Sequence, residues 1–189
     1  MFKQTPSQTV GPFFHPALVH SGENVLVDEQ TSGQLMFIVG KVYDGEGKPV
    51  NDALLEIWQA DSRGFFNHPI DPHCMQADRH FRGFGRTGTV NEGRFEFKTV
   101  KPGRLPGPDG QLQAPHIDIR VFSRGMLIHA YTRLYFSDER ANETDAVLNS
   151  VEPERRATLI AMRIESNDLP TYHLDIHLQG ENETVFFEP

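Results

Sequence analysis

The segment LMFIVGKVYDGEGKP, residues 35–49, decides the fold class. Its first ten residues are rich in β-branched and aromatic side chains, which favour a β-strand. The following DGEGKP contains the glycines and the proline of a tight turn. A strand that ends in such a turn is typical of a protein built from short antiparallel strands.

Several later segments alternate apolar and polar residues with the period of a strand. Residues 94–100 place Phe95 and Phe97 on one face, after the turn-like Asn91-Glu92-Gly93. In PHIDIRVFS, residues 115–123, every second side chain is apolar. These apolar side chains are Ile117, Ile119 and Val121, and the polar ones between them are His116, Asp118 and Arg120. LIHAYTRLYF and TYHLDIHLQG repeat the pattern, so the sequence predicts an all-β protein.

One segment departs from this period and predicts a helix. Ser150 is a suitable N-cap for a helix that passes Pro153 in its first turn and continues through PERRATLIAMRI, residues 153–164. Residues 34–189 are therefore predicted to form a sandwich of antiparallel sheets with one short helix. Residues 1–33 are predicted to form an extended N-terminal arm that is ordered rather than a flexible tail, because Phe13, Phe14 and Leu26 give it apolar surface to bury.

Composition and charge exclude several classes of function. The net charge of -8 argues against binding nucleic acids or anionic membranes, since both require clustered Lys and Arg. Cys74 is the only cysteine, so no internal disulfide is expected. The first residues lack the apolar core of a signal peptide, and no apolar run is long enough for a membrane helix. We therefore expect a cytoplasmic protein.

The residues alone leave the nature of any site open. His116 and Asp118 lie two apart on a predicted strand, so their side chains share one face and could bind one ion. From the residues alone, a solvated polar strand face is the favoured interpretation of this pair, and also of the set formed by His173, Asp175 and His177. The motifs of serine hydrolases and of phosphate-binding loops are absent from the sequence.

Six stretches, spread in consistent order over nearly the whole chain, carry a family resemblance. They are TPSQTVGPFFH at 5–15, GKVYDGEGKPVNDALLEIWQADSRGFF at 40–66, FGRTGTVNEGRFEFKTVKPG at 84–103, APHIDIRVFSRG at 114–125, TRLYFSDE at 132–139 and QGENETVFFE at 179–188. Together they resemble the intradiol ring-cleavage dioxygenases. The N-terminal SQT-x-GP and the TRLYF and VFFE segments are the most specific.

This resemblance implies a degenerate metal site. Catalytic members of the family hold Fe(III) with two tyrosinates and two histidines, because hard anionic phenolate oxygen stabilises the ferric ion. The two tyrosine positions fall on Phe66 and Leu105, and the histidine pair falls on His116 and Asp118. An arginine that supports catalysis in the family falls on Gln113. The resemblance therefore implies that this chain ligates no metal and is inactive alone.

The resemblance is strongest to the α subunits of heteromeric members, and it implies a supporting role. In these enzymes a β subunit holds the Fe(III), and the α arm reaches into its pocket, where protocatechuate reacts with O₂ to give 3-carboxy-cis,cis-muconate. The matching residues here are Thr9, Gly11, Pro12, Phe13 and Arg133. Glycine permits close backbone approach and proline fixes direction. Arg133 is expected to offset the carboxylate of the substrate, directly or through water.

Two alternatives remain open from the sequence. The first is a homomeric dioxygenase with a rearranged site, which would need Tyr131 or Tyr135 as oxygen ligands. The second is a non-catalytic module that binds carbohydrate or protein and shares only the G-x-V-x-D turn. The arm distinguishes the predicted subunit from the second alternative, since a binding module has no need of SQTVGPFF.

Overall fold

Strand β1 (Leu35–Tyr43) is central to the fold, and its side chains alternate between partly exposed and buried along its whole length. It pairs antiparallel with β4 (Arg94–Val100) and parallel with β8 (Thr171–His173) and β9 (Ile176–His177). The predicted turn follows at once, with the amide of Gly47 donating to the carbonyl of Asp44 at 3.0 Å. The segment that decides the fold class thus forms the predicted strand and turn.

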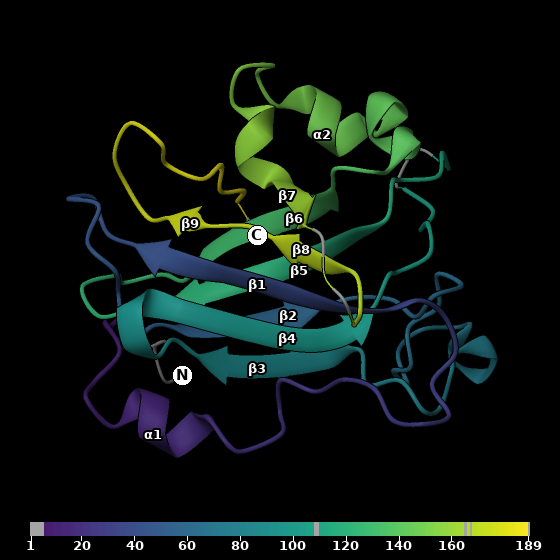
Figure 1. Ribbon diagram of the computed structural model, residues 1–189, viewed down its shortest axis with the longest axis horizontal. Coiled ribbons are helices and arrows are strands. Elements are labelled where there is room, and N and C mark those ends of the chain that lie inside the picture. The colour runs from purple at the N-terminus through teal and green to yellow at the C-terminus, as the bar shows by residue number, and fades with distance from the viewer. Residues whose placement is uncertain (1–5, 108–109, 165, 167, 189) are drawn as a thin grey trace, which may run out of the picture.

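The computed structural model describes residues 6–107, 110–164, 166 and 168–188. Over these residues one sheet has the strand order β3-β2-β5-β6-β7-β8-β1-β4, with β9 beside β1, and it curls into a nearly closed barrel (Figure 1). The remaining strands are β2 (Leu54–Trp58), β3 (Phe84–Gly88), β5 (His116–Phe122), β6 (Ala130–Phe136) and β7 (Ile160–Ile164).

The prediction of purely antiparallel sheets is wrong in part. Strands β1 and β8, β1 and β9, and β6 and β7 pair in parallel, while the other pairs are antiparallel. Alternation along a strand reports which face is buried, but it carries no information about the direction of the neighbouring strand. The all-β class is confirmed, and the direction of pairing depends on connections that the pattern does not encode.

The predicted helix over residues 150–164 is also wrong. Residues 160–164 form strand β7, which pairs with β6 at Ile160 and with β8 at Met162. Apolar residues at 159, 160 and 162 fit a short strand as well as a helix, and β-branched isoleucines favour the strand. The described helices are α1 (Phe14–Leu18), α2 (Ala146–Ser150) and the 3₁₀ turns Cys74–Gln76, Asn91–Gly93, Arg140–Thr144 and Arg156–Leu159.

Ser150, which was predicted to cap a helix, ends helix α2 instead. The Asp145 carboxylate accepts from the amide of Leu148 at 2.8 Å, so Asp145 caps the start of the helix and Ser150 is its last residue. Among the described residues no helix is long and apolar enough to cross a bilayer. The helices lie at the edges of the barrel, with α1 and α2 at opposite ends in Figure 1.

The barrel core contains the apolar residues that alternation predicted. Ile117, Ile119 and Val121 of β5 are buried, as are Phe95 and Phe97 of β4. Burying each such side chain contributes about 1.5–3 kcal/mol. Because these residues point inward, the residues between them on β5 point outward, and this places the candidate site on the outside of the sheet.

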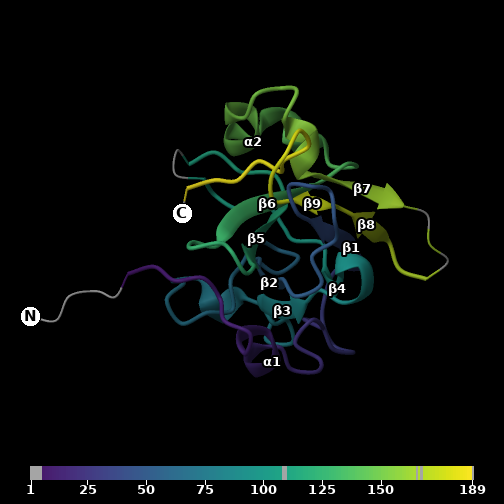
Figure 2. The same ribbon diagram turned by 90° about the vertical axis from the view of Figure 1, so that its left-hand side faces the viewer.

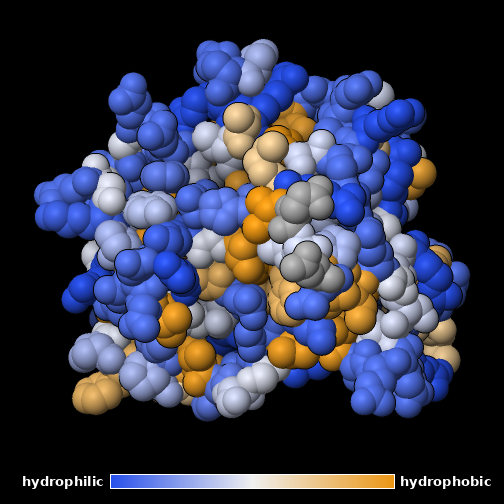
Figure 3. Space-filling view, in the orientation of Figure 1, coloured by the Kyte–Doolittle hydropathy of each residue, from blue (hydrophilic) through white to orange (hydrophobic). Residues whose placement is uncertain are grey.

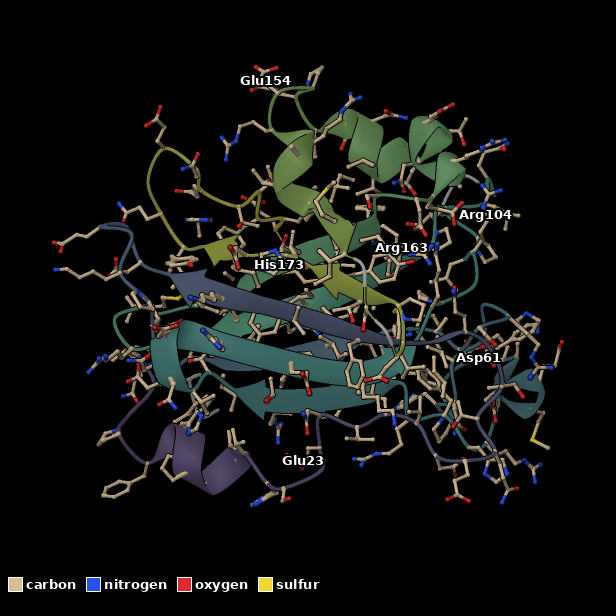
Figure 4. The ribbon with its side chains drawn as sticks, viewed as in Figure 1. Glu23, Asp61, Arg104, Glu154, Arg163 and His173 are labelled. Atoms are coloured by element: carbon tan, nitrogen blue, oxygen red, sulfur yellow. The ribbon has the colours of Figure 1, made fainter. Side chains whose placement is uncertain are left out.

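Residues 23–26, within the predicted arm, close the barrel. Strands β3 and β4 are the two ends of the strand order, and this segment lies between them. Leu26 and Asn24 exchange backbone hydrogen bonds of 2.9 Å with Lys98 of β4, and the Glu23 carbonyl accepts from Arg86 of β3 at 3.1 Å. Leu26 is fully buried, and Figure 4 shows Glu23 beside β3. The predicted arm therefore includes a part of the barrel, while its first five residues lie outside the described residues.

Candidate functional site

The antiparallel pairing of β5 and β6 brings the candidate residues together on the outer face of the sheet. His116 lies opposite Tyr135, and Asp118 lies opposite Arg133. Side chains that are directly opposite on one face of an antiparallel pair are about 5 Å apart at Cβ, close enough for direct contact. The sheet register alone therefore places Arg133 beside both members of the predicted degenerate histidine pair.

Arg133 is held by three polar partners, which are Asp118, Gln113 and the Tyr131 hydroxyl, to which its Nε donates at 3.5 Å. Its Nε lies 3.2 Å from Asp118 Oδ1, and its Nη1 donates to Gln113 Oε1 at 2.8 Å. The Tyr131 hydroxyl donates to the same Asp118 oxygen at 2.8 Å. The side chains of Arg133 and Asp118 are only 17% and 23% exposed, so solvent screens this ion pair weakly.

Hydrogen bonds and the charge of Asp118 keep Arg133 protonated, while burial keeps the nearby tyrosines neutral. Burial alone would lower the pKa of Arg133, but hydrogen bonds to Tyr131 and Tyr135 and the charge of Asp118 raise it above its usual value. Burial raises the pKa of Tyr131 and, more strongly, that of Tyr135. Both tyrosines therefore favour the phenol over the phenolate.

His116 is buried and neutral in this cluster. Its Nδ1 lies 2.8 Å from the carbonyl oxygen of Ala114, and because a carbonyl can only accept, Nδ1 carries the proton. Burial, together with the neighbouring Arg133 guanidinium, lowers the pKa of the imidazole. The ring lies 5.8 Å from that of Tyr135, whose hydroxyl donates to the buried carboxylate of Asp145 at 3.1 Å.

Two loops bring Phe66 and Leu105 to the same face. The Gly103 amide donates to the carbonyl of Asp61 at 2.9 Å, and a Cβ on Gly64 would lie 2.3 Å from the carbonyl oxygen of Arg104. The two loops are therefore in direct backbone contact, and Figure 4 shows Asp61 and Arg104 on the same side of the molecule. Only glycine permits this approach, since Gly64 also has a φ of +88°.

Phe66 packs against the cluster through its ring, and Leu105 is joined to it by a backbone hydrogen bond. Phe66 stacks on Trp58, with ring centroids 5.6 Å apart and planes within 5°, and Trp58 lies opposite Asp118 in the sheet. The carbonyl of Leu105 accepts from the amide of Gln113 at 2.7 Å. All five positions predicted as a degenerate metal site thus belong to one neighbourhood, with the Arg133 guanidinium bonded to two of them.

Sequence reasoning missed two members of this cluster. Trp58 could have been found from the pairing of β2 with β5, had the register been known. Asp145 is fully buried and binds the amides of Ala114 and Leu148 as well as the Tyr135 hydroxyl. Its signal was an aspartate directly before AVLNS, which is a typical N-cap position.

The side chains at these positions do not fit a ferric site. Phe66 and Leu105 offer only hydrocarbon, and the hydroxyls of Tyr131 and Tyr135 donate to carboxylates and resist ionisation. A guanidinium also lies within ion-pair distance of Asp118, where it would repel a metal ion. The same observations remove the support for a rearranged site built on Tyr131 or Tyr135.

The arm residues lie at a different place from Arg133. The Thr9 hydroxyl accepts from the amide of Gly125, in the turn between β5 and β6, at 2.7 Å. Gly11, Pro12 and Phe13 follow as an exposed turn, in which Phe13 is 81% exposed. Figure 2 shows residues 6–13, ahead of α1, outside the barrel. The structure therefore divides the predicted pocket residues between the strand centre and the end of the β5–β6 hairpin.

Comparison with known proteins gives a family match over most of the chain. Residues 9–180 match the model of a family described as dioxygenase. The chain is 42% identical to the protocatechuate 3,4-dioxygenase alpha chain of Pseudomonas putida, covering 100% of this chain and 98% of that protein. It is 43% identical to the alpha chain of Burkholderia cepacia, covering 98% of each.

Two further similarities concern a partner chain and the fold. The beta chain of the Burkholderia cepacia enzyme is 30% identical over 94% of this chain and 77% of that protein. Among solved structures, the dioxygenase domain of a dioxygenase and carbohydrate-binding fusion protein from Streptomyces sp. SirexAA-E matches with a TM-score of 0.64. It is 26% identical, and the match covers 94% of this chain and 99% of that chain.

Proposed function

Because the chain belongs to the intradiol ring-cleavage dioxygenases, we propose that it is the non-iron α subunit of a heteromeric enzyme that cleaves protocatechuate with O₂ to 3-carboxy-cis,cis-muconate. A β subunit supplies the Fe(III), and this chain completes the pocket in which the substrate reacts. Its similarity to alpha chains over its full length, and its weaker similarity to a beta chain, support this division of roles.

One observation carries the proposal, and it is the position of Arg133. The guanidinium lies among the residues that replace the family's metal ligands, bonded to Asp118 and Gln113. A fixed positive charge at this place competes with a bound cation, and no phenolate is available to offset it. This chain therefore needs a second subunit to supply the metal.

The arm is the part of this chain that we assign to the partner's pocket. Thr9, Gly11, Pro12 and Phe13 are the residues that match the arm of α subunits, and their exposure on the outside of the barrel supports this assignment. When bound, Fe(III) ligated by phenolates activates a chelated catecholate toward O₂. The arm shapes the pocket around the substrate and excludes water.

Arg133 is the second assigned contribution, and its internal bonds limit how it acts. Its side chain is 17% exposed and already bonded to Asp118 and Gln113. We assign it a long-range role, in which its charge acts on the substrate's carboxylate through water rather than by direct contact. The proposal predicts that any positively charged side chain at position 133 would play the same role.

The test is steady-state assay of the full chain co-produced with the β subunit, compared with a chain that lacks residues 1–14. We expect the truncated chain to keep its barrel, since residues 23–26 and the core are intact, but to give a holoenzyme with reduced kcat/KM for protocatechuate. An unchanged kcat/KM with full assembly would count against the role of the arm.

A further inference from the structure

Residues 9–18 form an arch that is fixed to the barrel at both ends. We infer that Gly88 of β3 is a positioning residue, whose missing side chain provides the space in which His15 seats helix α1 and thereby orients Gly11, Pro12 and Phe13 toward the partner subunit. This inference rests on the proposed function and adds to it the means by which the arm is held.

Gly88 is glycine for reasons of space, not of backbone conformation. A Cβ at this position would lie 1.6 Å from His15 Nε2 and within 2.6 Å of two further ring atoms. Its φ is not in the left-handed region, so any residue could adopt this backbone. The imidazole thus occupies the volume that a side chain on β3 would otherwise fill.

Three further contacts fix the arch on either side of His15. The Phe14 ring packs on Phe122 at the end of β5, with centroids 5.7 Å apart. At the C-terminal end of α1, the Leu18 carbonyl accepts from Arg86 Nη1 at 3.3 Å, and Arg86 is held by an ion pair of 2.6 Å with Glu56. At the other end Thr9 is bonded to the β5–β6 turn.

The middle of the arch is a hydrogen-bonded turn that is exposed to solvent. The Phe14 amide donates to the carbonyl of Gly11 at 3.1 Å, which closes a turn over residues 11–14. Phe13 projects from this turn with 81% of its surface exposed, and the space around Gly11 is open. Figure 3 shows apolar patches on the side of the molecule where α1 lies. An ordered turn loses less conformational entropy on binding than a free tail, which strengthens association.

The experiment measures the dissociation constant of the full chain for the β subunit of the same organism. We expect Gly88→Ala to weaken association about tenfold, or about 1.4 kcal/mol. The thermal unfolding temperature of the chain should change little, because the obstructing atoms belong to a side chain that can move away. Wild-type affinity in Gly88→Ala would overturn the inference.

A double-mutant cycle separates positioning from damage to the sheet. His15→Ala should weaken association as Gly88→Ala does, and the double variant should be no weaker than His15→Ala alone, because the added methyl then meets no ring. Additive losses in the double variant would show that the methyl acts on β3 itself, and would overturn the inference.

Two more variants complete the design. If Gly88→Ala does not fold, Phe14→Ala tests the same seat from the arm side, with Pro16→Ala on the exposed side of α1 as the matched control. Weaker association of Phe14→Ala than of Pro16→Ala supports the inference, and equal affinities overturn it. Deletion of residues 1–14 separates the inference from the proposed function. If the deletion weakens association and Gly88→Ala does not, only the inference is rejected. If the deletion does not weaken association, the proposed function is rejected as well.

Discussion

The side chains on the outer face of β5 and β6 are bonded within the chain, whereas those in the middle of the N-terminal arch are exposed to solvent. On the strand face Arg133, Asp118 and Tyr135 are largely buried, and each is bonded to other residues of the chain. In the arch, Phe13 is exposed, and Thr9 and Phe14 on either side of it contact the barrel. The polar groups at the positions that hold metal in the family are hydrogen-bonded within the chain, whereas the arch exposes apolar surface to solvent. This contrast supports the proposal that the arch, rather than the strand face, contacts the partner subunit.

The largest effect is expected from breaking the ion pair on the strand face. Arg133→Met leaves the Asp118 carboxylate partly buried without its cation, and we expect a loss of about 3 kcal/mol in the free energy of unfolding. Urea denaturation of the wild-type chain and the variant measures this directly. The control is the double variant Arg133→Met with Asp118→Leu, which removes both charges and should recover most of the loss.

A loss below about 1 kcal/mol in Arg133→Met would break the comparison, because it would place this ion pair among ordinary exposed pairs. The contacts on the strand face would then contribute no more to the stability of the chain than those of the arch. Failure of the double variant to recover stability would point instead to lost packing of the arginine side chain.

A smaller loss of stability is expected from a change at Tyr135, which is bonded to the N-cap residue of helix α2. Tyr135→Phe removes one of the hydrogen bonds to the fully buried Asp145 carboxylate, and we expect a loss of about 1.5 kcal/mol. Tyr131→Phe is the matched control, since its hydroxyl partner Asp118 keeps Arg133 and lies nearer to solvent. Thermal unfolding of both variants should rank Tyr135→Phe as the less stable one.

The third prediction concerns pH and is smaller again. Burial lowers the pKa of His116 in the folded chain, so as pH falls the unfolded chain takes up this proton first. Its contribution to stability is complete above about pH 6.5 and is lost as pH falls below that value. His116→Gln should therefore lose less stability than the wild type between pH 7.5 and pH 5.

The groups that face His116 determine how this result is interpreted. Arg133 opposes protonation of the imidazole, while Asp118 and Asp145 favour it. If wild-type and His116→Gln chains show equal losses on acidification, the dependence belongs to the carboxylates and not to His116. Unfolding followed by circular dichroism at several pH values distinguishes these cases.

The smallest effect on stability is expected in the arch. Phe13→Ser should change the free energy of unfolding by less than about 0.5 kcal/mol, because the ring is 81% exposed. The same variant should weaken association with the β subunit, as measured by titration of one subunit with the other. A large loss of stability would show that the arch is part of the folded core, and would remove the contrast with the strand face.

Part of the fold and the family could be predicted from the sequence. Alternation predicted β4 and β5 with their buried residues, and the family match confirms the resemblance. The assignment of Phe66, Leu105, Gln113, His116 and Asp118 as degenerate metal-site positions remains a prediction. The pairing of Asp118 with Arg133 was not predicted, because it depends on the register between β5 and β6. The roles assigned to Arg133 and to the arm residues toward a partner remain predictions.

The failures have a physical cause in common. The segment 153–164 carries apolar residues at spacings that suit a helix or a short strand, and tertiary pairing with β6 and β8 decides between them. The barrel closure by residues 23–26 depends in the same way on hydrogen bonds to Arg86 and Lys98, which are far away in sequence. The local sequence pattern indicates which residues are buried. The choice between helix and strand and the closure of the barrel depend instead on residues far away in the sequence.

Iron analysis of the separated subunits tests the central claim most directly. The holoenzyme is assembled from this chain and its β subunit, the two are separated, and iron content and the visible phenolate-to-iron absorption band are measured for each. Iron and colour found only with the β subunit are the predicted result. Stoichiometric iron and a visible band in the isolated chain that carries Phe66, Leu105 and Arg133 would contradict the account.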